Sequence, residues 1–328
     1  MTQSPLVSVV IPCFNYARFL GEALESVRQQ SLGEWECIVV DDGSTDDSVE
    51  VAKSFVADDP RFSCVRRSNR GPSAARNAGL AKAHGEYVQL VDADDLLEPD
   101  KLAVQAAFLA GHPKYAMVYS PMRFFTDAGG LRSYSRGRNR AQKDWMTLWP
   151  DTTDALLVAL VEGNTFPISA PLFRRSALEA VGKFDESLPS HEDWEFWLRW
   201  AFAGKRFFGL DAPGTRTLIR EHRDSLTRRT VVMAETRLVV RERIMRLAPT
   251  EVLRAKNREC MSYDQCELGA AHLSAGHWRT GLRWYLSGIS TARSKTRAAR
   301  ILGAHVIPDQ VLSIWRRLRW GAPNRENA

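Results

Sequence analysis

Three aspartates, Asp92, Asp94 and Asp95, stand within four residues, directly after an apolar run that ends at Val91. Carboxylates this close repel one another at neutral pH, so their proximity favours a bound cation. Mg²⁺ and Mn²⁺ take oxygen ligands, some from protein and the rest from phosphate and water. The cluster is therefore a candidate site for a metal ion with a diphosphate. The alternative is an acidic turn before the helix that Pro99 opens.

A second acidic turn, Asp41–Asp46, follows another apolar run. The carboxylate of Asp42 could accept hydrogen bonds from the base or the ribose hydroxyls of a nucleotide. Ser44 and Asp46 are more typical of helix N-caps, which would make the turn a simple junction between a strand and a helix.

The segment Asn69–Gly79 joins a polar loop to a run of small residues opened by Pro72. Small side chains let another backbone approach closely, and Arg76 could reach a phosphate or a base edge. The alternative for Arg76 is a structural ion pair inside a tightly packed helix.

Two further polar groups lie downstream. Glu192 and Asp193 open a tryptophan-rich segment, where Asp193 could act as a general base toward an acceptor hydroxyl. Acidic residues are also favourable in the first turn of any helix. His222 could supply a metal ligand as a neutral imidazole, although a surface histidine is the default.

The elements that must position these residues alternate along the first hundred residues. The apolar runs predict strands at Leu6–Ile11, Glu36–Val40, Phe62–Val65 and Tyr87–Val91, and the segments between them have helical spacing. This alternation predicts an α/β fold with a mostly parallel sheet flanked by helices. Ligands of such sheets bind beyond the carboxyl ends of the strands, where the polar turns stand.

The remainder of the chain is less regular. Arg132–Lys143 is basic and poor in apolar residues, so we expect an exposed loop. Asn164–Arg174 is predicted to be a strand and Glu192–Ala203 a helix, in which Trp194 and Trp197 either pack in the core or form a sugar-stacking wall. From Leu226 onward the pattern is helical throughout.

Charge divides the chain at the same point. Residues up to Ser225 hold 26 Lys and Arg against 31 Asp and Glu, whereas the rest holds 19 against 8. A basic helical tail fits either a solvated cap on the catalytic domain or peripheral contact with anionic lipid. The mixture of aromatic and basic residues at Ile314–Trp320 is typical of interfacial helices and suggests the lipid contact. No nucleic-acid-binding module is recognised. Without a membrane-spanning run or a signal peptide, a cytoplasmic place is expected, with contact at the inner face of the membrane.

Together these stretches resemble glycosyltransferase family 2, the inverting enzymes with the GT-A fold. The resemblance rests on five pieces in the family's order: Ser8–Asn15, Val40–Asp46, Asn69–Gly79, Leu90–Asp95 and Glu192–Trp194. It implies a catalytic domain at 1–225, with a nucleotide-binding half at about 1–112 and an acceptor half at about 113–225. A C-terminal helical extension then occupies 226–328. The Gln-x-x-Arg-Trp motif of processive synthases is missing, which favours a non-processive, bacterial type of enzyme.

The resemblance also assigns roles to residues. It implies that the donor nucleotide is lined by eight residues: Pro12, Phe14, Asn15, Asp42, Asn69, Arg76, Asp92 and Ala93. It implies that Mn²⁺ or Mg²⁺ is held by Asp94, with Asp92 and His222 as further candidates. Asp193 matches the catalytic base, and Glu192 lies beside it.

The expected reaction is inverting transfer of a sugar from a nucleotide-diphosphate donor, UDP by family habit, to a hydroxyl. The acceptor would be a saccharide or a lipid-linked saccharide in cell-surface polysaccharide or glycoconjugate synthesis. A nucleotidyltransferase is one alternative, but its Gly-rich loop is replaced here by Pro12–Asn15. A binding protein that keeps the fold without turnover is the other.

Overall fold

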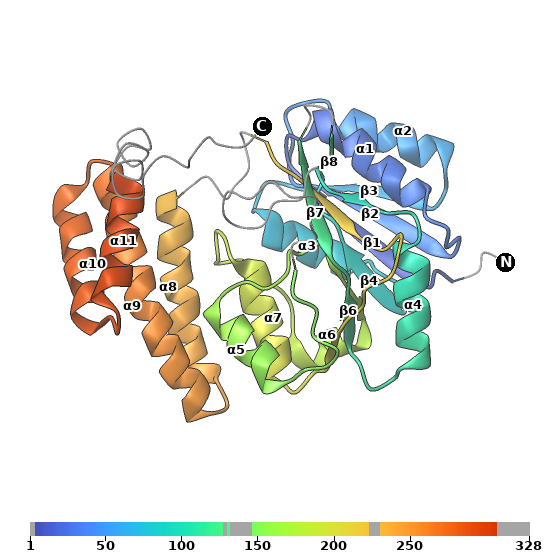
Figure 1. The fold of residues 1–328 in the computed structure, drawn as a ribbon. Coiled ribbons are helices and arrows are strands. Elements are labelled where there is room, and N and C mark those ends of the chain that lie inside the picture. The colour runs from blue at the N-terminus through green and yellow to red at the C-terminus, as the bar shows by residue number, and fades with distance from the viewer. Residues whose placement is uncertain (1–3, 127–129, 132–145, 223–229, 307–328) are drawn as a thin grey trace, which may run out of the picture. The chain divides into compact units, whose positions relative to one another are not determined.

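The computed structural model describes residues 4–126, 130–131, 146–222 and 230–306, and the chain divides into two compact units, Met1–Ser225 and Leu226–Ala328 (Figure 1). The expected loop at 132–143 and the aromatic, basic stretch at 314–320 lie outside the described residues.

The first unit begins with the predicted alternation of strands and helices. Its first elements are β1 (Val7–Cys13), α1 (Ala17–Arg28), β2 (Trp35–Asp41), α2 (Ser48–Asp58), β3 (Phe62–Arg66), α3 (Pro72–Leu80) and β4 (Tyr87–Leu90). Neighbouring residues of β1, such as Val9 and Val10, are equally buried although their side chains point to opposite faces. Both faces of the sheet are therefore covered, which explains the continuous apolar runs.

These strands belong to a seven-stranded sheet of order β10-β6-β9-β4-β1-β2-β3. The sheet is completed by β6 (Met117–Tyr119), β9 (Pro171–Arg174) and β10 (Phe207–Gly209). All neighbours run parallel except β9, which is antiparallel to both β4 and β6. The expected mostly parallel sheet is confirmed.

The strand expected at Asn164–Arg174 is wrong in its first part, because only Pro171–Arg174 pairs in the sheet. Pro167 precedes it in a turn that is closed by a hydrogen bond from the amide of Ala170 to the carbonyl of Pro167 (3.1 Å). The polar residues of this stretch point into the site instead of following the alternation of a strand.

A second, four-stranded sheet has the order β5-β11-β7-β8. Its strands are β5 (Leu96–Leu97), β7 (Met122–Thr126), β8 (Gly130–Leu131) and β11 (Thr217–Arg220). Because β11 pairs antiparallel with β5, the residues that follow β11 return to the acidic cluster that precedes β5. This sheet thus brings the distant His222 to the site.

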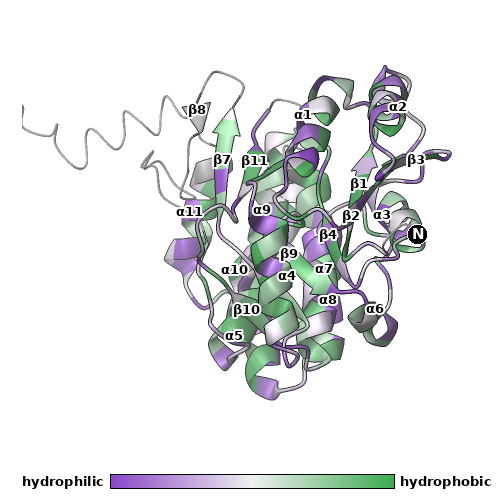
Figure 2. Ribbon diagram, turned by 90° about the vertical axis from the view of Figure 1, so that its right-hand side faces the viewer, coloured by the Kyte–Doolittle hydropathy of each residue, from purple (hydrophilic) through white to green (hydrophobic). Residues whose placement is uncertain are grey.

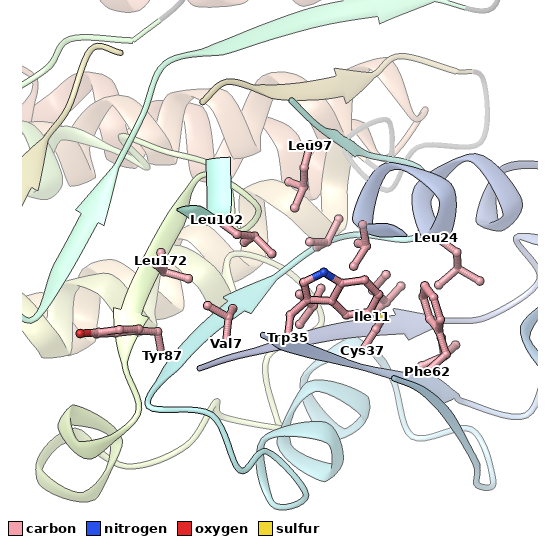
Figure 3. Packing of buried hydrophobic residues seen from close by; sticks show 14 of the residues in the cluster. Val7, Ile11, Leu24, Trp35, Cys37, Phe62, Tyr87, Leu97, Leu102 and Leu172 are labelled. Atoms are coloured by element: carbon pink, nitrogen blue, oxygen red, sulfur yellow. The ribbon is translucent and has the colours of Figure 1, made fainter. Parts of the chain in front are cut away.

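The remaining helices of the first unit are α4 (Lys101–Gly111), α5 (Asp154–Glu162), α6 (Ser176–Val181) and α7 (Glu192–Phe202). The helix α7 agrees with the prediction. Trp194 and Trp197 are both fully buried, so they belong to the core and do not form a sugar-stacking wall. In the main core, Trp35 meets the ring of Phe62 edge-on at 5.2 Å between centroids (Figure 3).

Proline is accommodated in β1 without losing a hydrogen bond. The carbonyl of Val10 accepts from the amide of Val91 (3.1 Å), on the side of β4. Two residues later, Pro12 turns its nitrogen to that same side, beyond the end of β4. On the opposite side the carbonyl of Cys13 still accepts from the amide of Asp42 (2.8 Å). The strand therefore stays paired with β2 up to its carboxyl end.

The described part of the second unit, residues 230–306, is helical, as predicted. It consists of α8 (Thr230–Leu247), α9 (Glu251–Ser274), α10 (Trp278–Thr291) and α11 (Lys295–Val306), with α9 packed against the other three. The side chain of Arg241 is buried between helices, where it binds the carboxylate of Asp264 (2.6 Å) and the amide oxygen of Asn257 (3.2 Å). Figure 2 shows polar and apolar stretches mixed along the ribbon. Within the described ranges, no helix has the length and apolar character to cross a bilayer.

The small residues of α3 allow the close approach that the sequence indicated. A methyl group at Gly79 would collide with the side chain of Val10 and press on that of Val40. We expect Gly79→Ala to lower the free energy of unfolding by about 1–3 kcal/mol, because overpacking forces neighbours from their rotamers. Denaturant titration measures this. Gly111→Ala, where no atom lies within 4 Å of the new methyl group, is the matched control and should be close to neutral. Equal effects of the two substitutions would refute the packing argument.

Candidate functional site

The turns after β1 and β2 are tied together by hydrogen bonds. The amide of Asn15 donates to the hydroxyl of Ser44 (2.9 Å), and the side-chain oxygen of Asn15 accepts from the amide of Thr45 (2.8 Å). Asn15 has a φ of 59°, a left-handed conformation that asparagine tolerates better than most residues. Phe14, between the turn and β1, is exposed. These contacts give the edge of the sheet a defined shape next to the expected nucleotide pocket.

Asp42 is buried and its carboxylate is occupied by the chain itself. It accepts from the amides of Arg70 (3.0 Å) and Gly71 (2.7 Å) and pairs with the Nε of Arg67 (3.1 Å). A nucleotide base would compete with these three donors. Asp42 therefore holds the loop that carries the exposed Asn69.

Arg76 joins the acidic cluster to the start of α7. Its side chain is 4% exposed, and its two terminal nitrogens bind Oδ1 of Asp92 (2.7 Å) and Oε1 of Glu192 (2.6 Å). Burial would lower the pKa of Arg76, but the two facing carboxylates raise it above its ordinary value. The guanidinium stays charged and connects two segments that lie far apart in the sequence.

The acidic cluster after β4 divides into three environments. Asp92 is the most exposed at 38%, Asp94 is 15% exposed, and Asp95 is buried. Asp95 accepts from the hydroxyl of Ser169 (2.8 Å) and the amide of Arg220 (3.3 Å). Burial, and then the charges of Asp94 and Asp92, raise the pKa of Asp95 well above its usual range. Asp95 thus holds the cluster in place, and its two neighbours face the site.

Asp94 and His222 form the pair that could bind a metal ion. The Oδ2 of Asp94 and the Nε2 of His222 are 2.8 Å apart. The imidazole packs against the rings of Tyr16 and Phe19, and its Nδ1 lies 3.3 Å from a guanidinium nitrogen of Arg18. Burial and the charge of Asp92 raise the pKa of Asp94, while His222 opposes this shift.

This donor set fits an ion that takes most of its ligands from elsewhere. Within the described part of the chain, no three His, Cys, Asp or Glu side chains converge as a complete metal site. One carboxylate and one imidazole leave most positions of an octahedral ion to diphosphate and water, which usually supply most of the ligands of Mg²⁺ in such sites. A cation would also relieve the cost of burying the charge of Asp94 beside Asp92.

Asp193 lies in the first turn of α7 and has no ion pair among the residues that the structure describes. Its two carboxylate oxygens accept from the side-chain amide of Asn164 (2.6 Å) and from the amide of Trp194 (2.7 Å). Burial, followed by the charge of Glu192, raises the pKa of Asp193 to about 7, although both hydrogen bonds and Arg76 oppose the shift. A carboxylate with such a pKa can accept a proton near neutral pH.

Sequence reasoning missed three residues that hold this arrangement. Asn164 orients Asp193, Ser169 donates to Asp95 and also accepts from the amide of Asp92 (3.1 Å), and Arg220 donates through its Nε to the carbonyl of Asp94 (3.0 Å). Asn164 and Ser169 fall in the stretch that was expected to be a strand. The available signal was that these two polar residues do not follow the alternation of a strand.

The protein-family model described as glycosyl transferase family 2 matches residues 8–182. An uncharacterized glycosyltransferase of Haemophilus influenzae is 31% identical over 201 residues, which cover 59% of this chain and 71% of that protein. The protein EpsE of Bacillus subtilis is 30% identical over 233 residues, which cover 70% of this chain and 78% of EpsE.

Two solved structures share the fold. TarS 1–349 of S. aureus in complex with UDP-GlcNAc has a TM-score of 0.62 at 19% identity, covering 98% of this chain and 94% of that one. The mannosyltransferase PcManGT of Pyrobaculum calidifontis in complex with GDP-Man and Mn²⁺ has a TM-score of 0.60 at 20% identity, covering 97% and 83%. These likenesses confirm the expected GT-A type of fold.

The buried position of Arg76 can be tested by removing its charge. Among the described residues, Arg76→Met leaves Glu192 without an ion-pair partner, so we expect the free energy of unfolding to fall by roughly 3 kcal/mol. Denaturant titration compares it with Arg70→Met, which breaks an exposed pair with Glu186 (3.0 Å) and should cost less than about 1 kcal/mol. If Arg76→Met costs no more than Arg70→Met, Arg76 does not hold the site together.

Proposed function

This chain belongs to glycosyl transferase family 2, and from that premise we propose that it transfers a sugar from a nucleotide-diphosphate donor to an acceptor hydroxyl, with inversion at the anomeric carbon. Family membership makes it a glycosyltransferase and argues against the nucleotidyltransferase and non-catalytic alternatives. The observation that carries the proposed mechanism is the carboxylate of Asp193, held by Asn164 and given a pKa of about 7.

Asp193 is the proposed general base. As the acceptor hydroxyl attacks the anomeric carbon, Asp193 takes its proton, and the bond from that carbon to the diphosphate oxygen breaks on the opposite face. Burial and Glu192 raise the pKa of Asp193 to about 7, so its carboxylate binds a proton more tightly than an ordinary one and is still partly charged at neutral pH. Glu192 itself is engaged with Arg76, so its proposed part is to tune and place the base.

Asp94 and His222 would hold Mn²⁺ or Mg²⁺ together with the donor diphosphate, and Asp92 lies beside them. The bound ion would neutralise the negative charge that develops on the leaving diphosphate. This assignment is supported by the adjacent oxygen and nitrogen of Asp94 and His222. It is also supported by PcManGT, which shares the fold and was solved in complex with Mn²⁺.

The donor nucleotide is proposed to lie along the carboxyl edge of the sheet. Pro12 lies at the end of β1 and Phe14 and Asn15 follow it. Asn69 follows β3, and Ala93 follows β4. A nucleoside diphosphate sugar is supported as the donor by TarS and PcManGT, which share the fold and were solved with UDP-GlcNAc and GDP-Man, and UDP is the proposed nucleotide. The proposed acceptor is a saccharide or lipid-linked saccharide of cell-surface polysaccharide or glycoconjugate synthesis.

Removing the proton-accepting group tests the base. We expect Asp193→Asn to reduce the transfer rate by about 100- to 10,000-fold while the donor still binds, because the amide keeps the shape but cannot take the proton. Transfer assays and donor titration calorimetry measure the two quantities. Asp211→Asn, at an exposed carboxylate, is the matched control and should transfer at the wild-type rate. Near-wild-type transfer by Asp193→Asn would exclude it as the base.

A thermal-shift panel of nucleotide sugars, with and without Mn²⁺, tests the donor site. A donor near a hundred times its dissociation constant should stabilise the folded state by about 2.7 kcal/mol, and this gain should require the metal. Asp94→Asn should lose the metal-dependent part of the gain. Equal donor binding by the wild-type chain with and without Mn²⁺ would argue against the metal site.

A further inference from the structure

The outer face of α10 carries a stripe of exposed apolar side chains. Trp278, Leu282 and Leu286 are 61%, 46% and 54% exposed. They follow one another at intervals of four residues, so they lie on one side of the helix. Single exposed apolar residues are ordinary on protein surfaces, but three in one row indicate a surface that meets something apolar.

This stripe is not needed to hold α10 in its bundle. A different face of the helix, with Gly281, Tyr285 and Gly288, is buried against α9. A methyl group at Gly281 or Gly288 would collide with atoms of α9, so the two helices approach as closely as their backbones allow. The position of α10 is therefore fixed by its inner face, and its outer face is available to a partner.

The charged residues of α10 itself are all basic. Arg279 and Arg283 lie next to the apolar row, and the sequence contains no acidic residue between Glu267 and Asp309. Within the described residues, neither arginine pairs with a carboxylate, whereas Arg254 and Arg258 of α9 both bind Glu251. Exposed lysine and arginines of α11 add to the same basic character: Lys295, Arg297 and Arg300.

We propose that this α10 face, made of Trp278, Arg279, Leu282, Arg283 and Leu286, docks on an anionic membrane surface. Tryptophan and leucine suit the boundary between headgroups and acyl chains, and arginine suits lipid phosphates. A second copy of the chain fits less well, because a symmetric dimer through this face would oppose like-charged arginines. Nucleic acid would leave the apolar row exposed to water. The proposal is independent of the transfer reaction.

Vesicle co-sedimentation of the full chain tests it. The wild-type chain should bind phosphatidylcholine vesicles that contain phosphatidylglycerol, and should bind vesicles of phosphatidylcholine alone much more weakly. Leu282→Ser with Leu286→Ser removes the apolar row, and Arg279→Glu with Arg283→Glu reverses the charges. Each pair should weaken binding to the anionic vesicles by about tenfold or more, and added salt should weaken wild-type binding.

The matched controls change the net charge by the same amount, or remove an exposed apolar side chain, at another place in the helical unit. Arg254→Glu with Arg258→Glu changes the charge of α9 equally, and Val239→Ser removes an exposed apolar side chain from α8. Both controls should bind anionic vesicles like the wild-type chain. Unchanged binding by the two α10 variants overturns the proposal, as does equal wild-type binding to both vesicle types. A wild-type dimer that becomes monomeric on Leu282→Ser with Leu286→Ser would assign the face to a second copy instead.

Discussion

The candidate site depends on the two ion pairs of the buried Arg76 guanidinium. It serves two carboxylates at once, Asp92 after β4 and Glu192 at the start of α7, and so joins the nucleotide end of the sheet to the expected acceptor side. With Arg76 engaged by these partners, Asp193 is left with hydrogen bonds and no ion pair of its own among the described residues. Its burial beside Glu192 then raises its pKa to about 7. Because Asp193 is buried and has no ion pair among the described residues, its pKa is high enough for it to act as a base at neutral pH.

Burial and the crowding of negative charge also raise the pKa values of carboxylates at the proposed metal site. Asp95 is buried and bound by Ser169 and the amide of Arg220, which fixes the turn. Asp94 faces His222, which opposes but does not cancel the rise in its pKa that burial and the charge of Asp92 cause. A divalent cation, bound together with the donor diphosphate, would compensate for these negative charges. The crowding of the three carboxylates, which would destabilise an ordinary turn, favours the binding of a cation.

The sequence was sufficient for the fold where local pattern and burial agree. The parallel strands are covered on both faces, so they appear as apolar runs, and the polar turns after β1, β2 and β4 follow from the topology. It was not sufficient for Asn164–Ala170, where apolar residues suggested a strand but the backbone turns at Pro167. The roles of Asn164 and Ser169 depend on partners far along the chain, which no local pattern specifies. The full burial of Trp194 and Trp197 likewise could not be predicted from the sequence, because it depends on how the core packs.

The pH dependence of sugar transfer by the wild-type chain tests the role of Asp193 most directly. The charged carboxylate is the form that accepts the proton, and it predominates only above the pKa of about 7. At saturating donor, transfer should be at its full rate at about pH 8 and should fall about tenfold per unit as the pH drops below about 7. A rate that stays level down to about pH 5 would contradict Asp193 as the base.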